Sequence, residues 1–267
     1  MASVAELSIE RKYKMYEDSV QNPECDIDFV ISEYQKCFGR KPHTLREDFA
    51  GTGYMACEWV KRSKDNQAWA IDLDSEPISY GLKNHYVTLN DEEKTRMKYL
   101  ESNVLSDLGF KTDTVVAFNF SYYIFKQRKE LLEYFSKVYA SLNEQGMLYL
   151  DLFGGTEAYA PQIEETEHES FSYFWDLEMF NPLNSECLYY IHFEDHKEGI
   201  RYNQVFTYDW RMWTPRELIE ILEEAGFKEV KTYWEGEDGL GGGDGNFYET
   251  QTASGCNSWV TYLVAVK

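Results

Sequence analysis

Thr44-Leu-Arg-Glu-Asp-Phe-Ala-Gly-Thr-Gly-Tyr-Met-Ala56 is the stretch that decides the fold of this 267-residue chain. It predicts a short strand, a G-x-G-x-x-A turn over Gly51–Ala56 and the first turn of a helix. Glycines let such a turn bend tightly and let its backbone approach a ligand closely. The next predicted strand, Ala68–Leu73, ends at Asp72, whose carboxylate can accept hydrogen bonds from both hydroxyls of a ribose. Together these elements predict a nucleoside-binding site.

Two carboxylates, Glu47 and Asp48, stand just before the turn and bear on which nucleoside binds there. A pyrophosphate, as in NAD, binds best to bare backbone amides at a helix start, and carboxylates at that place would repel it. They suit S-adenosylmethionine (SAM), which carries a sulfonium and an ammonium cation. The residues therefore favour SAM, and an NAD-type oxidoreductase using the same turn is the alternative.

Strands and helices alternate along the rest of the first half of the chain. Buried strands are predicted at Asp113–Phe120 and Met147–Phe153, and an amphipathic helix, Lys129–Leu142, lies between them. This alternation predicts an α/β fold, in which a doubly wound, mainly parallel sheet is covered by helices on both faces.

The C-terminal part is expected to complete that sheet. A capping box at Thr214–Glu217 starts a helix, and the strand Lys228–Trp234 follows it. The glycine-rich stretch Gly236–Gly245 is predicted as a flexible loop, and Ser258–Val266 as the last strand. This ending implies seven strands in all, with the last one inserted antiparallel.

Between these two parts the alternation is interrupted. Three antiparallel strands rich in aromatic residues are predicted at Phe171–Phe180, Cys187–Phe193 and Arg201–Tyr208. The sequence thus divides into an N-terminal helical lid, a cofactor-binding core in two parts, and a small antiparallel insertion after the fifth strand that we expect to bind substrate. The respective ranges are 1–24, 25–153 with 214–267, and 154–213.

Composition excludes several classes of partner. The 26 Lys and Arg against 47 Asp and Glu give a formal net charge of −21, which disfavours nucleic acid and anionic membranes. The five cysteines and five histidines form no metal-ligand spacing, so no metal is predicted. No signal peptide or membrane-spanning run is recognised. We therefore expect a cytoplasmic monomer or homodimer.

The sequence over roughly residues 25–153 and 214–267 resembles the class I, Rossmann-like, SAM-dependent methyltransferases. The family's common E/D-x-G-x-G-x-G motif is matched from Glu47 to Gly53, except that Phe49 stands where its first glycine would be. The resemblance implies that SAM is converted to S-adenosylhomocysteine at a cofactor site formed by Glu47, Gly51, Gly53, Asp72, Asn103 and Asn119.

Individual roles at this cofactor site also follow from the resemblance. Glu47 would help to position the methionine end, and the two glycines would pack against the cofactor. Asp72 would bind the ribose. Asn103 would read the adenine amino group, because an amide oxygen can accept that hydrogen bond as the family's usual acidic residue does.

Methyl transfer is an in-line displacement, so the protein chiefly aligns the acceptor and keeps it unprotonated. Asn119-Phe-Ser-Tyr-Tyr123 lies where the family's substrates approach the methyl group, and it resembles the Asn-Pro-Pro-Tyr loop of amine methyltransferases without its two prolines. We expect Asn119 to aim an amine, and either Tyr122 or water to accept its proton. The alternative is that Asn119 is only a turn residue that ends a strand.

Aromatic side chains are candidates for binding the acceptor, because ring faces attract a cationic amine. The residues expected to bind substrate are Tyr16, Tyr123, Trp175, Tyr208 and Arg211. Arg211 could clamp a carboxylate or pair with a neighbouring acid, and the aromatic residues could instead form core or a dimer interface, as alternating aromatic residues on antiparallel strands usually do. The sequence thus predicts a SAM-dependent methyltransferase of small molecules, with nitrogen favoured, an O-methyltransferase next and a non-catalytic binding module as the third reading.

Overall fold

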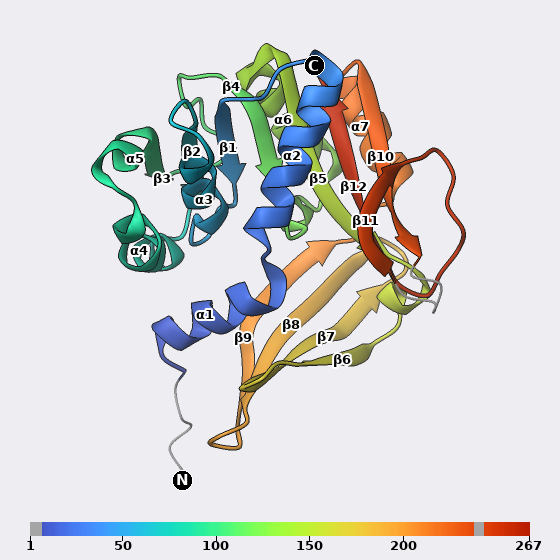
Figure 1. Ribbon diagram of the computed structural model, residues 1–267. Coiled ribbons are helices and arrows are strands. Elements are labelled where there is room, and N and C mark those ends of the chain that lie inside the picture. The colour runs from blue at the N-terminus through green and yellow to red at the C-terminus, as the bar shows by residue number, and fades with distance from the viewer. Residues whose placement is uncertain (1–6, 238–242) are drawn as a thin grey trace.

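The computed structural model describes residues 7–237 and 243–267, which form two β-sheets and the helices packed on them (Figure 1). The large sheet has eight strands in the order β11-β10-β12-β5-β4-β1-β2-β3, and the small sheet has four in the order β6-β7-β8-β9. The large-sheet strands are β1 (Thr44–Asp48), β2 (Gln67–Asp72), β3 (Met97–Glu101), β4 (Thr112–Ala117), β5 (Leu142–Gly154), β10 (Glu229–Glu237), β11 (Gly243–Glu249) and β12 (Trp259–Val266).

The central strands of the large sheet are parallel. β1 pairs in parallel with both β2 and β4, and β5 pairs in parallel with β4. β12 is antiparallel to both of its neighbours, β5 and β10, which confirms the predicted doubly wound sheet with an antiparallel last strand. The strand order reverses between β1 and β4, and in open α/β sheets ligands bind at the carboxyl ends of the strands at such a point.

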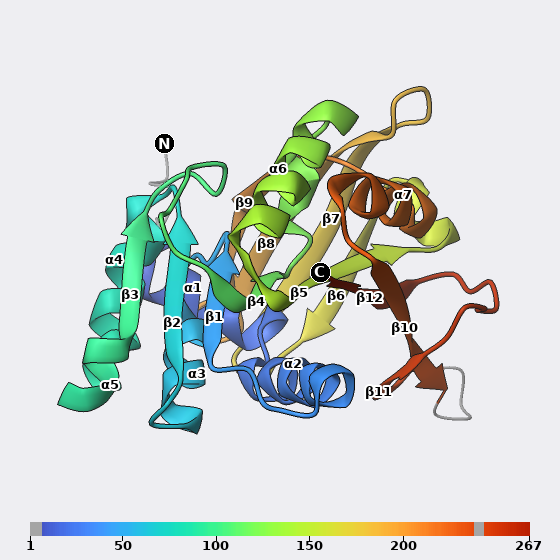
Figure 2. The same ribbon diagram turned by 90° about the horizontal axis from the view of Figure 1, so that it is seen from above.

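Helices cover both faces of this sheet (Figure 2). On one face α2 (Pro23–Phe38) and α3 (Tyr54–Arg62) pack against the sheet in one core cluster. On the other, α6 (Arg128–Ser141) and α7 (Pro215–Ala225) belong to a second cluster. Successive residues of β5 point to opposite faces, so Tyr149 belongs to the first cluster and Leu150 to the second. The predicted capping box of α7 is present.

The remaining helices lie near the carboxyl ends of the strands or at the edge of the sheet. They are α1 (Ile9–Val20), α4 (Ser75–Asn84) and α5 (Asp91–Arg96). Figure 1 shows α1 crossing beneath the large sheet and beside the small one, and α1 contacts both α4 and β7. Within the described ranges, no helix combines the length and apolar character needed to cross a membrane.

The structure corrects two expectations. The glycine-rich stretch predicted as a loop contributes to an eighth strand: β10 extends to Glu237 and forms an antiparallel hairpin with β11. The insertion has four strands, namely β6 (Gln162–Glu167), β7 (Phe171–Asn181), β8 (Glu186–Asp195) and β9 (Ile200–Arg211). β6 escaped prediction because it is an edge strand that is exposed beyond its first residue, so it shows no apolar alternation. Residues 1–6 of the expected lid and 238–242 of the expected loop lie outside the described residues.

Candidate functional site

Two cavities of about 270 Å³ each adjoin at the carboxyl ends of β1 and β4. The turn cavity surrounds the stretch from Glu47 to Thr52 and is bounded by the first turns of α4 and by α1. The aromatic cavity lies between α1 and the small sheet. Tyr16, Asn119 and Tyr208 line both cavities, so the two spaces share a wall of three side chains.

The turn cavity is strongly acidic. Its lining includes five acidic residues, Asp26, Glu47, Asp48, Asp72 and Asp74, of which Asp48 is ion-paired with the buried Arg46 at 2.6 Å. The one basic side chain among the described residues that line it is Lys12, whose Nζ is bonded to Oε1 of Glu76 at 2.7 Å. Such a field favours a cationic ligand over a phosphate.

The backbone of the turn is left-handed at three places. Gly51 has φ 54°, Gly53 has φ 65° and Phe49 has φ 55°. A Cβ at position 53 would lie 2.6 Å from the ring of Tyr99, so only glycine fits there. Phe49 adopts a conformation that side chains rarely take, while its ring packs against Tyr134 with centroids 5.7 Å apart. The departure from the family motif at Phe49 therefore keeps a glycine-like backbone and adds an aromatic wall to the cavity.

Two of the predicted cofactor residues are fixed to this turn by backbone contacts. Oε2 of the buried Glu47 accepts a hydrogen bond from the N–H of Ala56 at 2.9 Å. Burial, together with the nearby carboxylates of Asp26 and Asp72, raises the pKa of Glu47 to about 8. Oδ2 of Asp72 accepts from the N–H of Gly51 at 2.6 Å, so this carboxylate is held against the turn.

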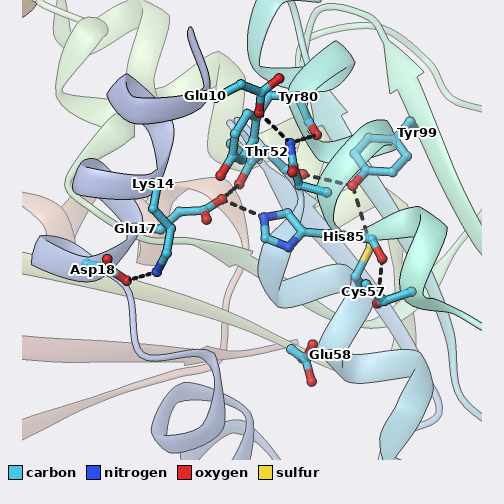
Figure 3. A network of polar contacts seen from close by, with 12 residues as sticks. Glu10, Lys14, Glu17, Asp18, Thr52, Cys57, Glu58, Tyr80, His85 and Tyr99 are labelled. Atoms are coloured by element: carbon cyan, nitrogen blue, oxygen red, sulfur yellow. Dashed lines mark hydrogen bonds and ion pairs between the residues drawn. The ribbon is translucent and has the colours of Figure 1, made fainter. Parts of the chain in front are cut away.

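Helix α1 is attached to the same turn by a buried carboxylate (Figure 3). Oε1 of Glu17, which is 5 % exposed, accepts from the hydroxyl of Thr52 at 2.6 Å and lies 2.6 Å from Nε2 of His85. The hydroxyl of Tyr99 donates to the carbonyl of Thr52 at 2.8 Å. These contacts hold Tyr13 and Tyr16 of α1 over the cavities.

The aromatic cavity is walled by rings from the insertion. Trp175 stacks on Tyr189 with centroids 4.5 Å apart, and Tyr208 lies 4.4 Å from Trp210. Its aromatic lining residues are Tyr16, Phe120, Phe153, Tyr173, Trp175, Tyr189, Tyr208 and Trp210. These flat faces can hold an apolar or cationic group.

Asn119 is positioned by an acid that sequence reasoning missed. The carboxylate of Asp151, at the end of β5, accepts from the N–H of Asn119 at 2.7 Å and from the N–H of Phe120 at 2.9 Å. Both residues have φ 56°, a strained conformation that these two bonds hold in place. Burial raises the pKa of Asp151 to about 7 even though the hydrogen bonds from the two amides act to lower it. The one available signal was an acidic residue inside an otherwise apolar strand.

Several predicted residues lie elsewhere. The hydroxyl of the buried Tyr122 donates to the carbonyl of Asp151 at 2.8 Å, and Tyr122 lines neither cavity. Tyr123 is also buried outside them, where its ring lies 5.8 Å from those of Phe153 and Trp210. Both tyrosines, which the sequence analysis predicted beside the acceptor, are therefore part of the hydrophobic core.

Arg211 and Asn103 also lie apart from the two cavities. Nη2 of Arg211 donates to Glu217 at 3.0 Å, and its guanidinium lies over the ring of Trp213, so it pairs with an acid as the alternative interpretation had it. Asn103 is exposed in the loop after β3, where its Oδ1 accepts from the N–H of Leu105. Its contact with adenine stays a prediction.

The structure brings seven of the predicted residues together around the two cavities. They are Tyr16, Glu47, Gly51, Asp72, Asn119, Trp175 and Tyr208. Gly53 shapes the turn without lining either cavity. Within residues 7–237 and 243–267 no group of three His, Cys, Asp or Glu side chains has a geometry that could hold a metal ion.

Comparison with known proteins finds similar structures but no similar sequences. No protein-family model matches the sequence, and no curated protein is significantly similar to it. A SAM-dependent methyltransferase from Clostridium acetobutylicum superposes with a TM-score of 0.70 at 14% identity, covering 97% of this chain and 99% of the other. An amino pentose methyltransferase from Micromonospora echinaspora superposes with a TM-score of 0.66 at 14% identity, covering 98% of each chain. A sugar N-methyltransferase from a Streptoalloteichus species superposes with a TM-score of 0.64 at 15% identity, covering 100% of this chain and 97% of the other. The chain therefore has the fold of the class I SAM-dependent methyltransferases.

Proposed function

We propose that the protein transfers a methyl group from SAM to a nitrogen atom of a small molecule. In this proposal SAM occupies the turn cavity and the acceptor occupies the aromatic cavity. The observation that carries it is the shared wall of Tyr16, Asn119 and Tyr208, where a methyl group on one side can reach a nucleophile on the other. Two structurally similar proteins, an amino pentose methyltransferase and a sugar N-methyltransferase, support nitrogen as the acceptor atom.

The residues of the turn cavity fit SAM better than NAD. Asp72 would bind the ribose hydroxyls with the lone pairs that the N–H groups of Gly51 and Asp74 leave free. Glu47 and Asp26 would face the ammonium group of the methionine end. A pyrophosphate in this cavity would meet the acidic side chains of Asp26, Glu47, Asp72 and Asp74, which is the physical reason to set the oxidoreductase alternative aside.

SAM supplies a methyl group already activated by its sulfonium, so the chain's own residues align and desolvate the acceptor. The side-chain oxygen of Asn119 would accept an N–H of the amine and aim its lone pair across the shared wall. As the nitrogen forms its bond to carbon it becomes positively charged, and the ring faces of Trp175 and Tyr208 stabilise that charge. The nitrogen then releases its proton to water, because Tyr122 lies outside the cavity.

The decisive experiment uses deuteriomethyl SAM and a metabolite extract. Mass spectrometry is expected to reveal a metabolite that gains the labelled methyl group, and fragmentation is expected to place it on nitrogen. A label on oxygen would contradict the assignment of nitrogen as the acceptor atom but would still support a methyltransferase activity. Heat stabilisation by NAD but not by S-adenosylhomocysteine would overturn the proposal as a whole.

A further inference from the structure

The charge of the aromatic cavity restricts its ligands. Two charged side chains, Glu157 and Glu164, line it, and no Lys, Arg or His does so in the described part of the chain. Residues 1–6 and 238–242 contain none of these side chains either, as the sequence alone shows. No basic side chain is therefore available in the cavity to bind an anionic group.

Three basic side chains of the insertion and its surroundings are already paired with acids. Arg211 is bonded to Glu217, and Lys126 is paired with Asp209 and lies 3.7 Å from Glu186. His192 is buried against Asp176 at 2.9 Å.

His168 reaches the cavity only through another side chain. Its Nε2 lies 3.3 Å from the hydroxyl of Ser19, which does line the cavity, and its ring stacks on Phe171. A carboxylate or phosphate that entered would therefore lose its hydration without gaining an ion pair, which is strongly unfavourable.

The two acids in the lining influence one another. Glu164 lies on the exposed strand β6, where partial desolvation and then the carboxylate of Glu157 raise its pKa; its Oε1 also accepts a hydrogen bond from Nε2 of Gln162 at 2.9 Å. A cation at this side of the cavity would relieve their repulsion. The opposite walls are ring faces, including the stacked pair Trp175 and Tyr189, which also attract cations.

We infer that the acceptor is an amine with a flat, apolar body and without a phosphate or carboxylate group. This inference rests on the proposed function and narrows it. The cavity volume of about 270 Å³ lies near the lower end for small-molecule sites, which suits a body of one or two rings. Nucleotide-linked sugars and free amino acids are thereby excluded as acceptors.

The test is titration calorimetry of the full chain saturated with S-adenosylhomocysteine. The probes are tyramine and tryptamine, each compared with its carboxylated counterpart, tyrosine or tryptophan. At least one amine is expected to bind, and its counterpart at least about tenfold more weakly, or ~1.4 kcal/mol. Equal or tighter binding of the amino acids, or no binding of either amine at millimolar concentration, would overturn the inference.

Variants locate the effect in the cavity. Glu164→Gln is expected to weaken the binding of the amine by about three- to tenfold. The affinity for a neutral probe, 4-ethylphenol, should stay unchanged. Glu165→Gln is the matched control, because the next residue of β6 lies outside the lining and points to the other side of the strand. An equal effect of both variants would contradict a local charge contact. Failure of S-adenosylhomocysteine itself to bind would instead refute the proposed function.

Discussion

The carboxylate of Glu17 in α1 accepts a hydrogen bond from the hydroxyl of Thr52, the residue between the two glycines of the turn (Figure 3). Residues 35 positions apart are thus joined by a contact of 2.6 Å. Because α1 also supplies Tyr13 and Tyr16 to the cavity lining, we predict that this bond couples closure of the helix to the conformation of the turn.

Replacing Glu17 is expected to loosen this closure. Glu17→Ala leaves Thr52 and His85 without their buried acceptor, at a cost of about 1–3 kcal/mol. Stopped-flow measurement should show roughly tenfold faster release of S-adenosylhomocysteine. Asp18→Ala is the control, because Asp18 pairs with Lys14 on the exposed side of the same helix. Unchanged release from Glu17→Ala would show that α1 is not a lid.

Glu47 is expected to couple SAM binding to proton release. Burial raises its pKa to about 8, so it is mostly protonated at pH 7, and the cations of SAM would lower that pKa again. Calorimetry in buffers of different ionisation enthalpy should detect up to about one proton released at pH 7, with affinity rising from pH 6 to pH 8. Glu47→Gln should abolish both effects, and persistence of the proton release would assign it to another acid.

The same shift predicts how stability depends on pH without ligand. The carboxyl of Glu47 ionises near its ordinary value of 4.5 in the unfolded chain but only near 8 in the folded one. The folded state therefore binds more protons between these values, and the free energy of unfolding falls as pH rises through this window. Urea titrations of the parent and of Glu47→Gln measure this slope, which the variant should reduce.

Removing the carboxylate of Asp72, which we expect to bind the ribose, should weaken the binding of SAM. Asp72→Ala deletes a charge-assisted contact and also frees the N–H of Gly51, so affinity should fall by roughly 1.5–3 kcal/mol. Asp65→Ala, an exposed acid in the segment before β2, is expected to leave affinity unchanged. Equal dissociation constants for the parent and Asp72→Ala would count directly against the cofactor assignment.

Asn119 is expected to affect turnover rather than cofactor binding. Asn119→Ala removes the oxygen that aims the amine and should lower kcat by about ten- to a hundredfold, ~1.4–2.7 kcal/mol, with little change in SAM affinity. The rate of the parent should rise with pH as the acceptor amine loses its proton, since a lysine-like amine has a pKa of about 10.4. A flat pH profile together with an intact rate in the variant would indicate an oxygen nucleophile.

The walls of the aromatic cavity are expected to set KM. Trp175→Leu removes one face of the stack with Tyr189 and should raise KM for the acceptor several-fold while SAM affinity holds. Trp234→Leu is the control, because Trp234 packs on Trp259 outside both cavities. If both variants only lower the melting temperature, Trp175 belongs to the core and not to a binding site.

The sequence by itself determined the local features of this protein. The glycine turn, the strand that ends at Asp72 and the capped helix from Thr214 follow from backbone sterics, periodicity and capping, which act within a few residues. The antiparallel position of the last strand also followed, because the order of elements limits how a sheet can close.

Tertiary structure decided which side chains reach the site. Tyr122 and Asn119 are three residues apart, yet Tyr122 turns into the core and Asn119 lines both cavities. That difference depends on Asp151, which approaches from a neighbouring strand 32 residues away and fixes two left-handed residues. Arg211 likewise donates a hydrogen bond to Glu217 of a different element, α7. Such contacts depend on register and on the packing of distant elements, which local periodicity and spacing do not specify.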